Sequence, residues 1–463
     1  MSMDKTKELY SGKKIVILGL AKSGVAIAKI MKNAGATVVV NDRKPEEECQ
    51  GVAELRGLGI PVICGSHPDD LIDASIDLLI KNPGIPYGIS PIEKALELGI
   101  PVVTEVEIAY QISPAPIIGI TGSNGKTTTT TLVGLILEEG GRSPVVAGNI
   151  GTVLSEQAVN IQSKQVFVAE LSSFQLKGTQ TFRPWIGCLL NVYNAHLDYH
   201  KTKEDYVHSK RNLFVNQTAE DIAVFNYDNS YCRDMAEGLK SKVLWFSLTQ
   251  EVEQGSFLKE GKICFRHALD GEIEEIIPIE NIALPGEHNL ENVLAAVTIT
   301  RAAGVSSQVI QQVLTTFTGV EHRLEFVGEV DGVKYYNDSK ATNPEAASRA
   351  IRSFKQPIVL IAGGLDRGID FKELIPHFQN RVKTLLTYGQ TAEILLKRGE
   401  DAGIKNLIRV DNVNDAVAKA HQVAEGGEVV LLSPACASWD MYTSFEERGS
   451  MFKQSVHKLK TSP

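Results

Sequence analysis

The chain reads IGITGSNGKTTTT from Ile118 to Thr130, and this stretch decides the fold of the middle of the protein. The apolar run Pro116–Ile120 predicts a β-strand, the Gly, Ser and Asn residues predict a turn, and an apolar helix is expected to begin at Leu132. Such a turn directs backbone N–H groups and a helix N-terminus toward one point, as the phosphates of a nucleotide require. The stretch therefore predicts a nucleotide-binding domain of the α/β class.

Two side chains of this stretch fit that chemistry. Lys126 would neutralise the β- and γ-phosphates, and the hydroxyl of Thr127 would bind Mg²⁺. The spacing departs from G-x-x-x-x-G-K-[ST], because Ile120 stands at the position of the first glycine. A glycine turn without a ligand is the alternative, but Gly-Lys-Thr between a strand and a helix favours a site for ATP or GTP.

Composition limits the classes of protein to which the chain can belong. It has 463 residues, of which 43% are hydrophobic and 22% charged, with a net charge of −9. These values are typical of a globular protein of several domains and argue against a nucleic-acid partner. No apolar run reaches the roughly 18 residues of a membrane span, and no secretion signal is recognised. The six cysteines form no C-x-x-C pair, so we expect a cytoplasmic protein with reduced cysteines.

Strands alternate with helices along the whole chain, which predicts α/β domains with mostly parallel sheets. Residues 1–104 open with the strand Lys14–Leu18, the helical stretch Val25–Asn33 and the strand Thr37–Val40, a Rossmann-like βαβ unit. Ala21 replaces the middle glycine of the G-x-G-x-x-G fingerprint. A βαβ unit that binds no ligand is therefore an equally good interpretation of this stretch.

Residues 105–319 and 320–463 form the second and third predicted domains. The second contains strands at Val166–Ala169 and Ile186–Val192, an antiparallel excursion in residues 250–280 and a packing helix at Asn289–Ala303. The third contains the segment Lys334–Asn337 and strands at Ile358–Ile361, Thr384–Tyr388 and Val429–Leu432. Small or polar residues end these three strands of the third domain, which predicts ligand-binding loops at the carboxyl edge of its sheet.

Two further residues follow buried strands of the second domain. Glu170 stands where nucleotide hydrolases keep a carboxylate for Mg²⁺, although a solvated glutamate is the alternative. His196 also ends a strand, and its residue type leaves a structural role equally open.

Ten segments together resemble the Mur ligase family. In chain order they are Thr121–Thr127, Gly148–Gly151, Glu170–Leu176, Asn191–His196, Gly286–Asn292, His322-Arg323, Asn337–Asn343, Gly363-Gly364, Leu432–Asp440 and Phe445–Gly449. The similarity extends over nearly the whole chain, from about residue 15 to 452.

The resemblance implies three domains: a Rossmann-like domain for a UDP-sugar, a phosphate-loop ATPase domain and a C-terminal Rossmann-like domain for an incoming amino acid. It implies a monomeric cytoplasmic enzyme of peptidoglycan precursor synthesis with ATP and two Mg²⁺ ions. The last two segments resemble the branch that adds D-glutamate to UDP-N-acetylmuramoyl-L-alanine through an acyl phosphate. Sister ligases that add L-alanine, a diamino acid or glutamyl units to folate are the alternatives.

The resemblance also carries roles for individual residues. Those expected to be catalytic are Lys126, Glu170, His196, Lys210 and Lys340, and Thr127, Glu170, His196 and Lys210 belong to the metal sites. ATP is expected at Gly122, Ser123, Asn124, Gly125, Lys126, Thr127, Thr128, Asn289, Asn292, Arg323 and Asp338. The UDP substrate is expected at Ser23, Asp42, Arg43, Lys44, Asn82, Gly84, Asn149 and Ser172, and the amino acid at Lys340, Thr342, Arg367, Ser438 and Phe445.

Some of these roles have open alternatives. Arg43 and Lys44 could be ordinary surface charges, and Asn289 and Asn292 could cap or pack a helix. Lys210 is expected to be carbamylated, which would convert a cation that repels Mg²⁺ into an anion that supports it. Lys201 and Lys203 are the competing lysines, and Lys210 could also be an exposed helix lysine.

Overall fold

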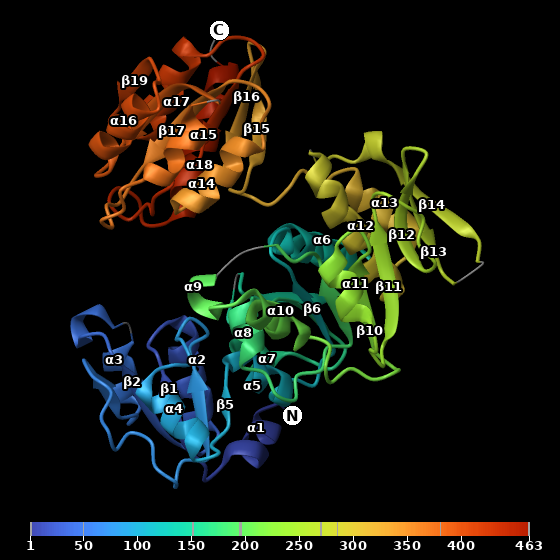
Figure 1. Ribbon diagram of the computed structural model, residues 1–463, viewed down its shortest axis with the longest axis vertical. Helices are drawn as coiled ribbons and strands as arrows, with labels where there is room; N and C mark the ends of the chain where they lie inside the picture. Colours follow the sequence, from blue (N-terminus) through green and yellow to red (C-terminus); the bar gives the residue numbers. More distant parts are fainter. Residues whose placement is uncertain are drawn as a thin grey trace. The chain divides into compact units, whose positions relative to one another are not determined.

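The structure is a computed structural model that describes residues 2–49, 51–150, 152–193, 197–268, 271–284, 286–379 and 381–461. It contains three sheets, each accompanied by helices (Figure 1). Residues 1–317, with the first two sheets, form one compact unit, and residues 318–463 form a second. The two units are described separately below.

The first sheet is entirely parallel, with strand order β3-β2-β1-β4-β5. Its elements are α1 (Ser2–Tyr10), β1 (Lys14–Leu18), α2 (Lys22–Asn33), β2 (Thr37–Asp42), η1 (Glu46–Glu48), α3 (Val52–Gly57), β3 (Val62–Cys64), β4 (Leu78–Lys81), α4 (Ser90–Glu97) and β5 (Val102–Val103). The predicted βαβ opening is confirmed, with α2 beginning three residues earlier than expected. The strand order reverses at β1, which lies between β2 and β4, and ligands bind at such switch points.

The second sheet has the order β14-β13-β12-β11-β10-β9-β6-β8-β7. Its strands are β6 (Ile117–Thr121), β7 (Pro144–Gly148), β8 (Val166–Glu170), β9 (Ile186–Leu189), β10 (Ile222–Asn226), β11 (Lys242–Ser247), β12 (Gly255–Lys259), β13 (Lys262–Arg266) and β14 (Ile273–Pro278). Its helices are α5 (Glu105–Ile112), α6 (Lys126–Glu139), α7 (Leu154–Asn160), α8 (Ser173–Lys177), α9 (Leu197–His200), α10 (Lys203–Arg211), α11 (Ser230–Ala236), η2 (Ile279–Asn281), α12 (Glu287–Ala302) and α13 (Ser307–Leu314).

This sheet confirms the predicted antiparallel excursion, because β12, β13 and β14 pair antiparallel. The strand β12 also pairs parallel with β11, so the excursion extends the main sheet. Strand β6 lies between β8 and β9, with Ile118 opposite Val168 on one side and Ile186 on the other. The ends of these three strands therefore meet at one edge of the sheet.

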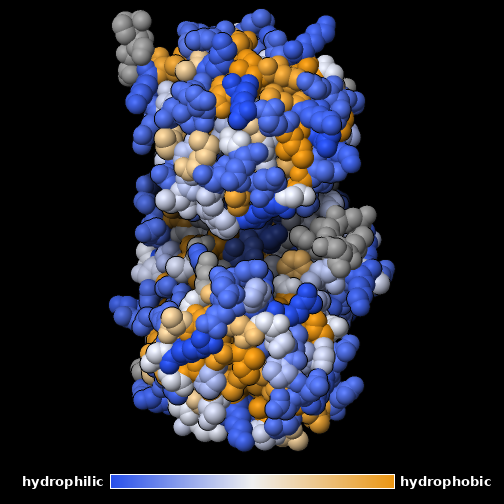
Figure 2. Space-filling view, turned by 90° about the vertical axis from the view of Figure 1, so that its left-hand side faces the viewer, coloured by the Kyte–Doolittle hydropathy of each residue, from blue (hydrophilic) through white to orange (hydrophobic). Residues whose placement is uncertain are grey.

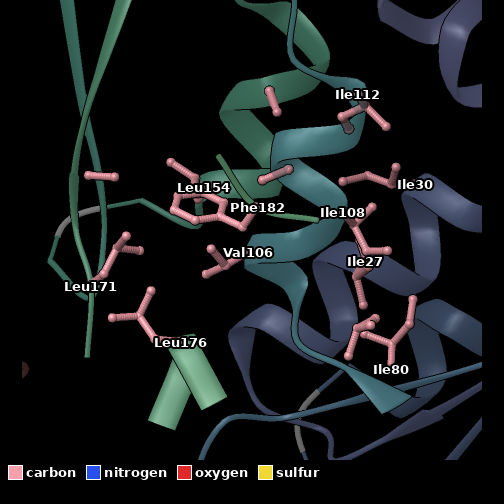
Figure 3. Packing of buried hydrophobic residues seen from close by; sticks show 14 of the residues in the cluster. Ile27, Ile30, Ile80, Val106, Ile108, Ile112, Leu154, Leu171, Leu176 and Phe182 are labelled. Carbon is pink, nitrogen blue, oxygen red and sulfur yellow. The ribbon is translucent and has the colours of Figure 1, made fainter. Parts of the chain in front are cut away.

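The helix α5 joins the first two sheets into one core (Figure 3). Ile108 and Ile112 face Ile27 and Ile30 of α2, whereas Val106 faces the side chains around Phe182. All of these side chains are almost fully buried. Because burying each such side chain contributes about 1.5–3 kcal/mol, α5 ties the first sheet to the second.

The third sheet has the order β15-β16-β20-β17-β18-β19, parallel except for β15. Its elements are β15 (Glu325–Val330), β16 (Val333–Asn337), α14 (Pro344–Arg352), β17 (Ile358–Gly363), η3 (Lys372–Leu374), α15 (Ile375–Phe378), β18 (Val382–Tyr388), α16 (Ala392–Asp401), β19 (Asn406–Arg409), α17 (Val413–Val423), β20 (Val429–Leu432) and α18 (Phe445–Thr461). The three strands predicted in this region are confirmed, and the segment Lys334–Asn337 lies in a further strand, β16.

Among the described residues, no helix has the length and apolar character needed to cross a membrane. On the face that Figure 2 displays, hydrophobic residues are interspersed among hydrophilic ones. All six cysteines are free thiols, four of them buried, while Cys49 and Cys64 are only partly buried.

Candidate active site

The loop between β6 and α6 occupies the carboxyl edge of the second sheet. Helix α6 begins at Lys126, so the expectation of a start at Leu132 is wrong. The threonine run after Lys126 is helical because Thr129 and Thr130 pack inside the protein instead of remaining in the turn. The N-cap Gly125 has a φ of 82°, and a Cβ there would lie 2.1 Å from the Asn292 side-chain oxygen. Only glycine fits this position.

The loop is held by the segment that follows β9. The Asn124 N–H donates to Asn191 Oδ1 at 2.9 Å, and the Tyr193 N–H donates to Ser123 Oγ at 2.9 Å. The Tyr206 hydroxyl lies 2.9 Å from the same Ser123 oxygen. Sequence reasoning gave Asn191 and Tyr206 no role, although Asn191 opens the segment Asn191–His196 on which the family resemblance was partly based. These contacts fix the shape of the loop before any ligand binds.

Two lysine ammonium groups converge on the loop carbonyls. Lys126 Nζ donates to the carbonyls of Gly122 at 2.9 Å and Ser123 at 3.2 Å. Lys210 Nζ, from α10, donates to the same Gly122 carbonyl at 2.9 Å and to the Thr121 hydroxyl at 3.3 Å. Lys210 is only 1% exposed, so it is not an exposed helix lysine. Burial, followed by the Lys126 ammonium, lowers the pKa of Lys210 well below its ordinary value.

Glu170 ends β8 and is 2% exposed. Its Oε1 accepts from Asn149 Nδ2 at 2.8 Å, whereas its buried Oε2 has no hydrogen-bond partner among the described residues. A buried carboxylate oxygen without a partner is costly unless a cation satisfies it. Together with the buried Thr127 hydroxyl in the first turn of α6, Glu170 provides the oxygen ligands that suit Mg²⁺. His196, the other predicted metal ligand, lies outside the described residues.

Asn289 and Asn292, the two asparagines expected at the ATP site, lie on α12. Asn292 Nδ2 donates to Asn289 Oδ1 at 3.0 Å, and Asn292 Oδ1 lies 3.4 Å from the Thr129 hydroxyl. Neither is the N-cap of α12, which is Gly286. Asn292 therefore packs against the phosphate loop, where it contacts α6.

The first sheet brings together the expected UDP-binding residues at its switch point. Asp42 Oδ2 accepts from the Leu20 N–H at 2.7 Å, and its Oδ1 accepts from the Lys44 N–H at 2.9 Å. Asn82 Nδ2, after β4, lies 3.4 Å from the hydroxyl of Ser23 at the start of α2. The side chains of Arg43 and Lys44 are exposed.

Three other expected substrate residues have local contacts in this unit. The Gly84 N–H donates to Asn82 Oδ1 at 3.4 Å, which closes the turn after β4. Asn149 holds Glu170, as described above. Ser172 caps α8 by accepting from the Gln175 N–H at 3.3 Å.

In the second unit, Asp338 follows β16 and is buried. It accepts from the Ser433 hydroxyl at 2.9 Å and from the Leu324 N–H at 3.2 Å, and burial raises its pKa to about 7. The nearby Arg323 guanidinium acts in the opposite direction, because a cation favours the charged carboxylate.

The expected amino-acid-binding residues also lie in this unit. Lys340 Nζ is 5.9 Å from the centre of the Phe445 ring, and the Arg367 guanidinium is 5.0 Å from that of Trp439. The Thr342 N–H donates to the Lys340 carbonyl at 2.9 Å, and Ser438 is 2% exposed.

Sequence reasoning missed the role of Arg448, which is fully buried in α18. Its guanidinium donates to the Ser339 hydroxyl at 2.9 Å, to the Ser339 carbonyl at 2.8 Å and to the Cys436 carbonyl at 3.1 Å. It therefore joins the loop that carries Lys340 to the loop that carries Ser438.

One group of acidic and histidine side chains in this unit has metal-like spacing, formed by Glu321, His322 and Glu325. Lys453 Nζ lies 2.7 Å from a carboxylate oxygen of each glutamate. The Lys453 ammonium takes the place that a metal cation would occupy beside the two glutamates, so this group does not indicate a metal site.

Known proteins resemble the chain over its whole length. Residues 13–104 match the Mur ligase MurD-like N-terminal domain, residues 120–300 the Mur ligase middle domain, and residues 322–436 the Mur ligase glutamate ligase domain. The chain is 50% identical to UDP-N-acetylmuramoylalanine--D-glutamate ligase of Geobacillus sp. (strain WCH70), over 98% of this chain and 100% of that protein. The protein of the same name from Bacillus cytotoxicus is 49% identical, with the same coverage.

Solved structures share the fold at lower identity. MurF from Acinetobacter baumannii gives a TM-score of 0.57 at 17% identity, covering 99% of this chain and 98% of that one. The UDP-N-acetylmuramate-alanine ligase MurC from Thermotoga maritima gives 0.54 at 18% identity, covering 97% and 100%. From these matches and the full-length identity of its relatives, the chain belongs to the Mur ligase family.

Proposed function

We propose that this protein is an ATP-dependent ligase that joins D-glutamate to UDP-N-acetylmuramoyl-L-alanine in peptidoglycan precursor synthesis. The observation that carries this proposal is the 50% identity, over nearly all of both chains, to a ligase named for that reaction. The alternative is a sister amide ligase of the same family with another amino acid. The domains proposed are residues 1–104 for the UDP substrate, 105–319 for ATP and 320–463 for the amino acid.

The proposed ATP site is the loop Gly122–Thr128 together with Asn289, Asn292, Arg323 and Asp338. Its support is the arrangement of the loop, where the Lys126 ammonium donates to the Gly122 and Ser123 carbonyls. This cation and the N-terminus of α6 attract the polyanionic phosphates, and the glycine turn leaves room for their oxygens.

The divalent metal ions proposed are held by Thr127, Glu170, His196 and carbamylated Lys210. The unpartnered Glu170 oxygen supports this for the first ion. When bound, Mg²⁺ would neutralise phosphate charge and polarise the transferring group. Within the chain, Asn149 keeps Glu170 in one orientation by binding its other oxygen.

The proposed UDP-substrate residues are Ser23, Asp42, Arg43, Asn82, Gly84, Asn149 and Ser172. The proposed D-glutamate residues are Lys340, Thr342, Arg367, Ser438 and Phe445, where two cations would bind two carboxylates. In the reaction, the substrate carboxylate takes the γ-phosphoryl group of ATP and ADP leaves. The amine then attacks the acyl carbon, loses a proton, and phosphate is expelled as the amide forms. Phosphorylation is needed because a free carboxylate has no adequate leaving group.

Carbamylation of Lys210 is proposed on chemical grounds. A carbamate forms when a neutral amine attacks CO₂, and burial lowers the pKa of this lysine in the required direction. The competing Lys201 is exposed and Lys203 lies 4.2 Å from the Tyr231 ring, so neither has the buried environment of Lys210. A cytoplasmic location and a monomeric state are also proposed.

The test is a phosphate-release assay with ATP, Mg²⁺, UDP-N-acetylmuramoyl-L-alanine and each candidate amino acid separately. The proposal expects turnover with D-glutamate and none with L-glutamate, L-alanine or a diamino acid. Turnover with L-alanine or a diamino acid but not with D-glutamate would assign the chain to a sister activity.

A further inference from the structure

Lys81 is a buried cation that none of the roles above uses. It is the last residue of β4, directly before the turn that contains Asn82 and Gly84, and it is 1% exposed. Its ammonium donates to the Pro83 carbonyl at 3.1 Å and to the Tyr199 hydroxyl at 3.2 Å. It also lies 4.8 Å from the centre of the Tyr87 ring.

The Lys81 ammonium is shielded from water, and among the described residues no carboxylate forms an ion pair with it. Burial, followed by the Lys177 ammonium, lowers the pKa of Lys81 to about 7. A buried ammonium is costly unless polar atoms satisfy it. Two oxygen acceptors and the faces of Tyr87 and Tyr199 provide that compensation.

Tyr199 belongs to a different part of the chain, the helix α9 beside the second sheet. Its hydroxyl also lies 3.0 Å from the Pro83 carbonyl and 3.2 Å from the Ile85 carbonyl. Its ring packs edge-on against Phe174 of α8 at 4.4 Å. Tyr199 therefore links the second sheet's helices to the turn after β4, because its ring packs on α8 and its hydroxyl contacts the turn.

The segment that carries Tyr199 is held in place by contacts of its own. His200, the next residue, stacks on Phe174 at 5.4 Å and is held by Asp205 at 2.8 Å and Ser173 at 2.9 Å. The Tyr87 hydroxyl adds a second connection, because it donates to the Lys177 carbonyl at 3.3 Å. The turn is thus anchored at both Lys81 and Tyr87 to the region of α8 and α9.

We infer that Lys81 and Tyr199 are a pair of positioning residues that fix the turn 82–85 for the diphosphate of the UDP-linked substrate. This inference rests on the proposed function, which assigns Asn82 and Gly84 to that substrate. Neither Lys81 nor Tyr199 touches a reacting atom. They act through the Pro83 carbonyl, whose orientation sets the neighbouring backbone N–H groups of the turn.

The kinetic test uses Lys81→Met, Tyr199→Phe and the double variant. Methionine keeps the length of the side chain, and phenylalanine keeps the ring on Phe174 but removes the hydroxyl. Each single variant is expected to raise KM for UDP-N-acetylmuramoyl-L-alanine about tenfold, while kcat and KM for ATP change less than twofold. The double variant should resemble the single variants, because either substitution breaks the same connection.

Ile80→Val is the matched control, since Ile80 is a buried neighbour on β4 with no polar side-chain atom. It should lower stability without changing KM for the UDP substrate. Unchanged KM for the UDP substrate in Lys81→Met, additive effects of the two substitutions, or an equal rise of KM for the UDP substrate and for ATP would overturn the inference.

Amide hydrogen exchange separates this inference from the proposed function, because it requires no substrate. Lys81→Met and Tyr199→Phe should both speed exchange in a peptide covering residues 82–87, whereas Ile80→Val should not. Failure of the wild-type protein to turn over would contradict the proposed function alone. Unchanged exchange in the two variants would contradict the positioning pair alone.

Discussion

Two strand–turn–helix connections in the first unit share a backbone plan but differ in charge. One joins β1 to α2 and the other joins β6 to α6. Both follow a parallel strand, both contain glycines, and both helices begin with a lysine, Lys22 in the first and Lys126 in the second. The difference lies in what surrounds the turns.

In the first turn, a carboxylate already occupies one of the backbone donors. Asp42 accepts from the Leu20 N–H, and Gly24 packs so closely that a Cβ would lie 1.9 Å from the Gly19 carbonyl oxygen. In the second turn, the Lys126 ammonium donates to the Gly122 and Ser123 carbonyls. This positive charge suits the second turn to the nucleotide phosphates that we proposed there, whereas the first turn suits a ligand that carries less charge at that point.

The largest expected effect comes from removing the charge at the second turn. Lys126→Ala should lower kcat about a thousandfold, because the transferring phosphate loses a direct cation. Its folding should be unchanged, since the side chain leaves no core cavity. Steady-state kinetics and circular dichroism provide the measurement.

Lys22→Ala is the control for this prediction, because Lys22 is exposed at the same position of its helix. It should leave kcat within twofold of the wild type. An unchanged kcat in Lys126→Ala would remove the difference between the two turns.

Lys210→Ala should lower kcat about a hundredfold, because the carboxylate that the carbamate would supply is lost. A short carboxylic acid such as acetate should restore part of the activity by occupying the vacated space. Lys203→Ala, on the same helix, should neither lose activity nor respond to acetate. Full activity of Lys210→Ala without added acid would refute the carbamate.

Alanine at Gly125 of the second turn and at Gly24, which lies in the first helical turn of α2 and packs on Gly19, should separate the two ligands. Gly125→Ala forces a Cβ against Asn292 and should raise KM for ATP about tenfold, while KM for the UDP substrate stays nearly constant. Gly24→Ala should raise KM for the UDP substrate and leave KM for ATP nearly constant, because the strained contact of the new Cβ lies beside Ser23. Equal changes of both KM values in either variant would mean that the turns do not bind separate ligands.

The smallest expected effect is a pH dependence of stability that involves Lys81. Its pKa is about 7 in the folded protein and about 10.4 in an unfolded chain, so the unfolded state binds more protons between these values. The free energy of unfolding should therefore rise with pH across this window, by about 1–2 kcal/mol between pH 7 and 9 relative to Lys81→Met.

Urea unfolding of both proteins, followed by tryptophan fluorescence in a Trp439→Phe background, measures this difference. The background substitution leaves Trp185 and Trp245, which both lie in the first unit. If the free energies of unfolding of the two proteins differ by the same amount at about pH 7 and pH 9, the result would argue against a lowered pKa of Lys81.

The sequence predicted the fold where apolar periodicity is strong. The strands around Ile118, Val168 and Val430 lie close to where they were expected, because buried parallel strands read as continuous apolar runs. The start of α6 was misplaced because threonines have low helix propensity, and tertiary burial of Thr129 and Thr130 overrides that preference.

Residues of the candidate active site could be predicted only where a sequence motif specifies both the residue type and its spacing. Lys126 and Glu170 are such residues, since each follows a strand within a motif. Lys81, Asn191 and Arg448 act through contacts with segments far away in the chain, and a single sequence contains no record of such contacts. Burial of a lysine that has no carboxylate partner among the described residues, such as Lys81, is visible only in three dimensions.

The central claim is that ATP activates the substrate carboxylate as an acyl phosphate before D-glutamate attacks it. The most direct test uses UDP-N-acetylmuramoyl-L-alanine with ¹⁸O in its terminal carboxylate, followed by mass analysis of the phosphate released with D-glutamate. Acyl phosphate formation predicts that one ¹⁸O atom from the carboxylate appears in each phosphate ion, with the other retained in the amide. Phosphate without ¹⁸O, at full yield of the amide, would contradict the claim.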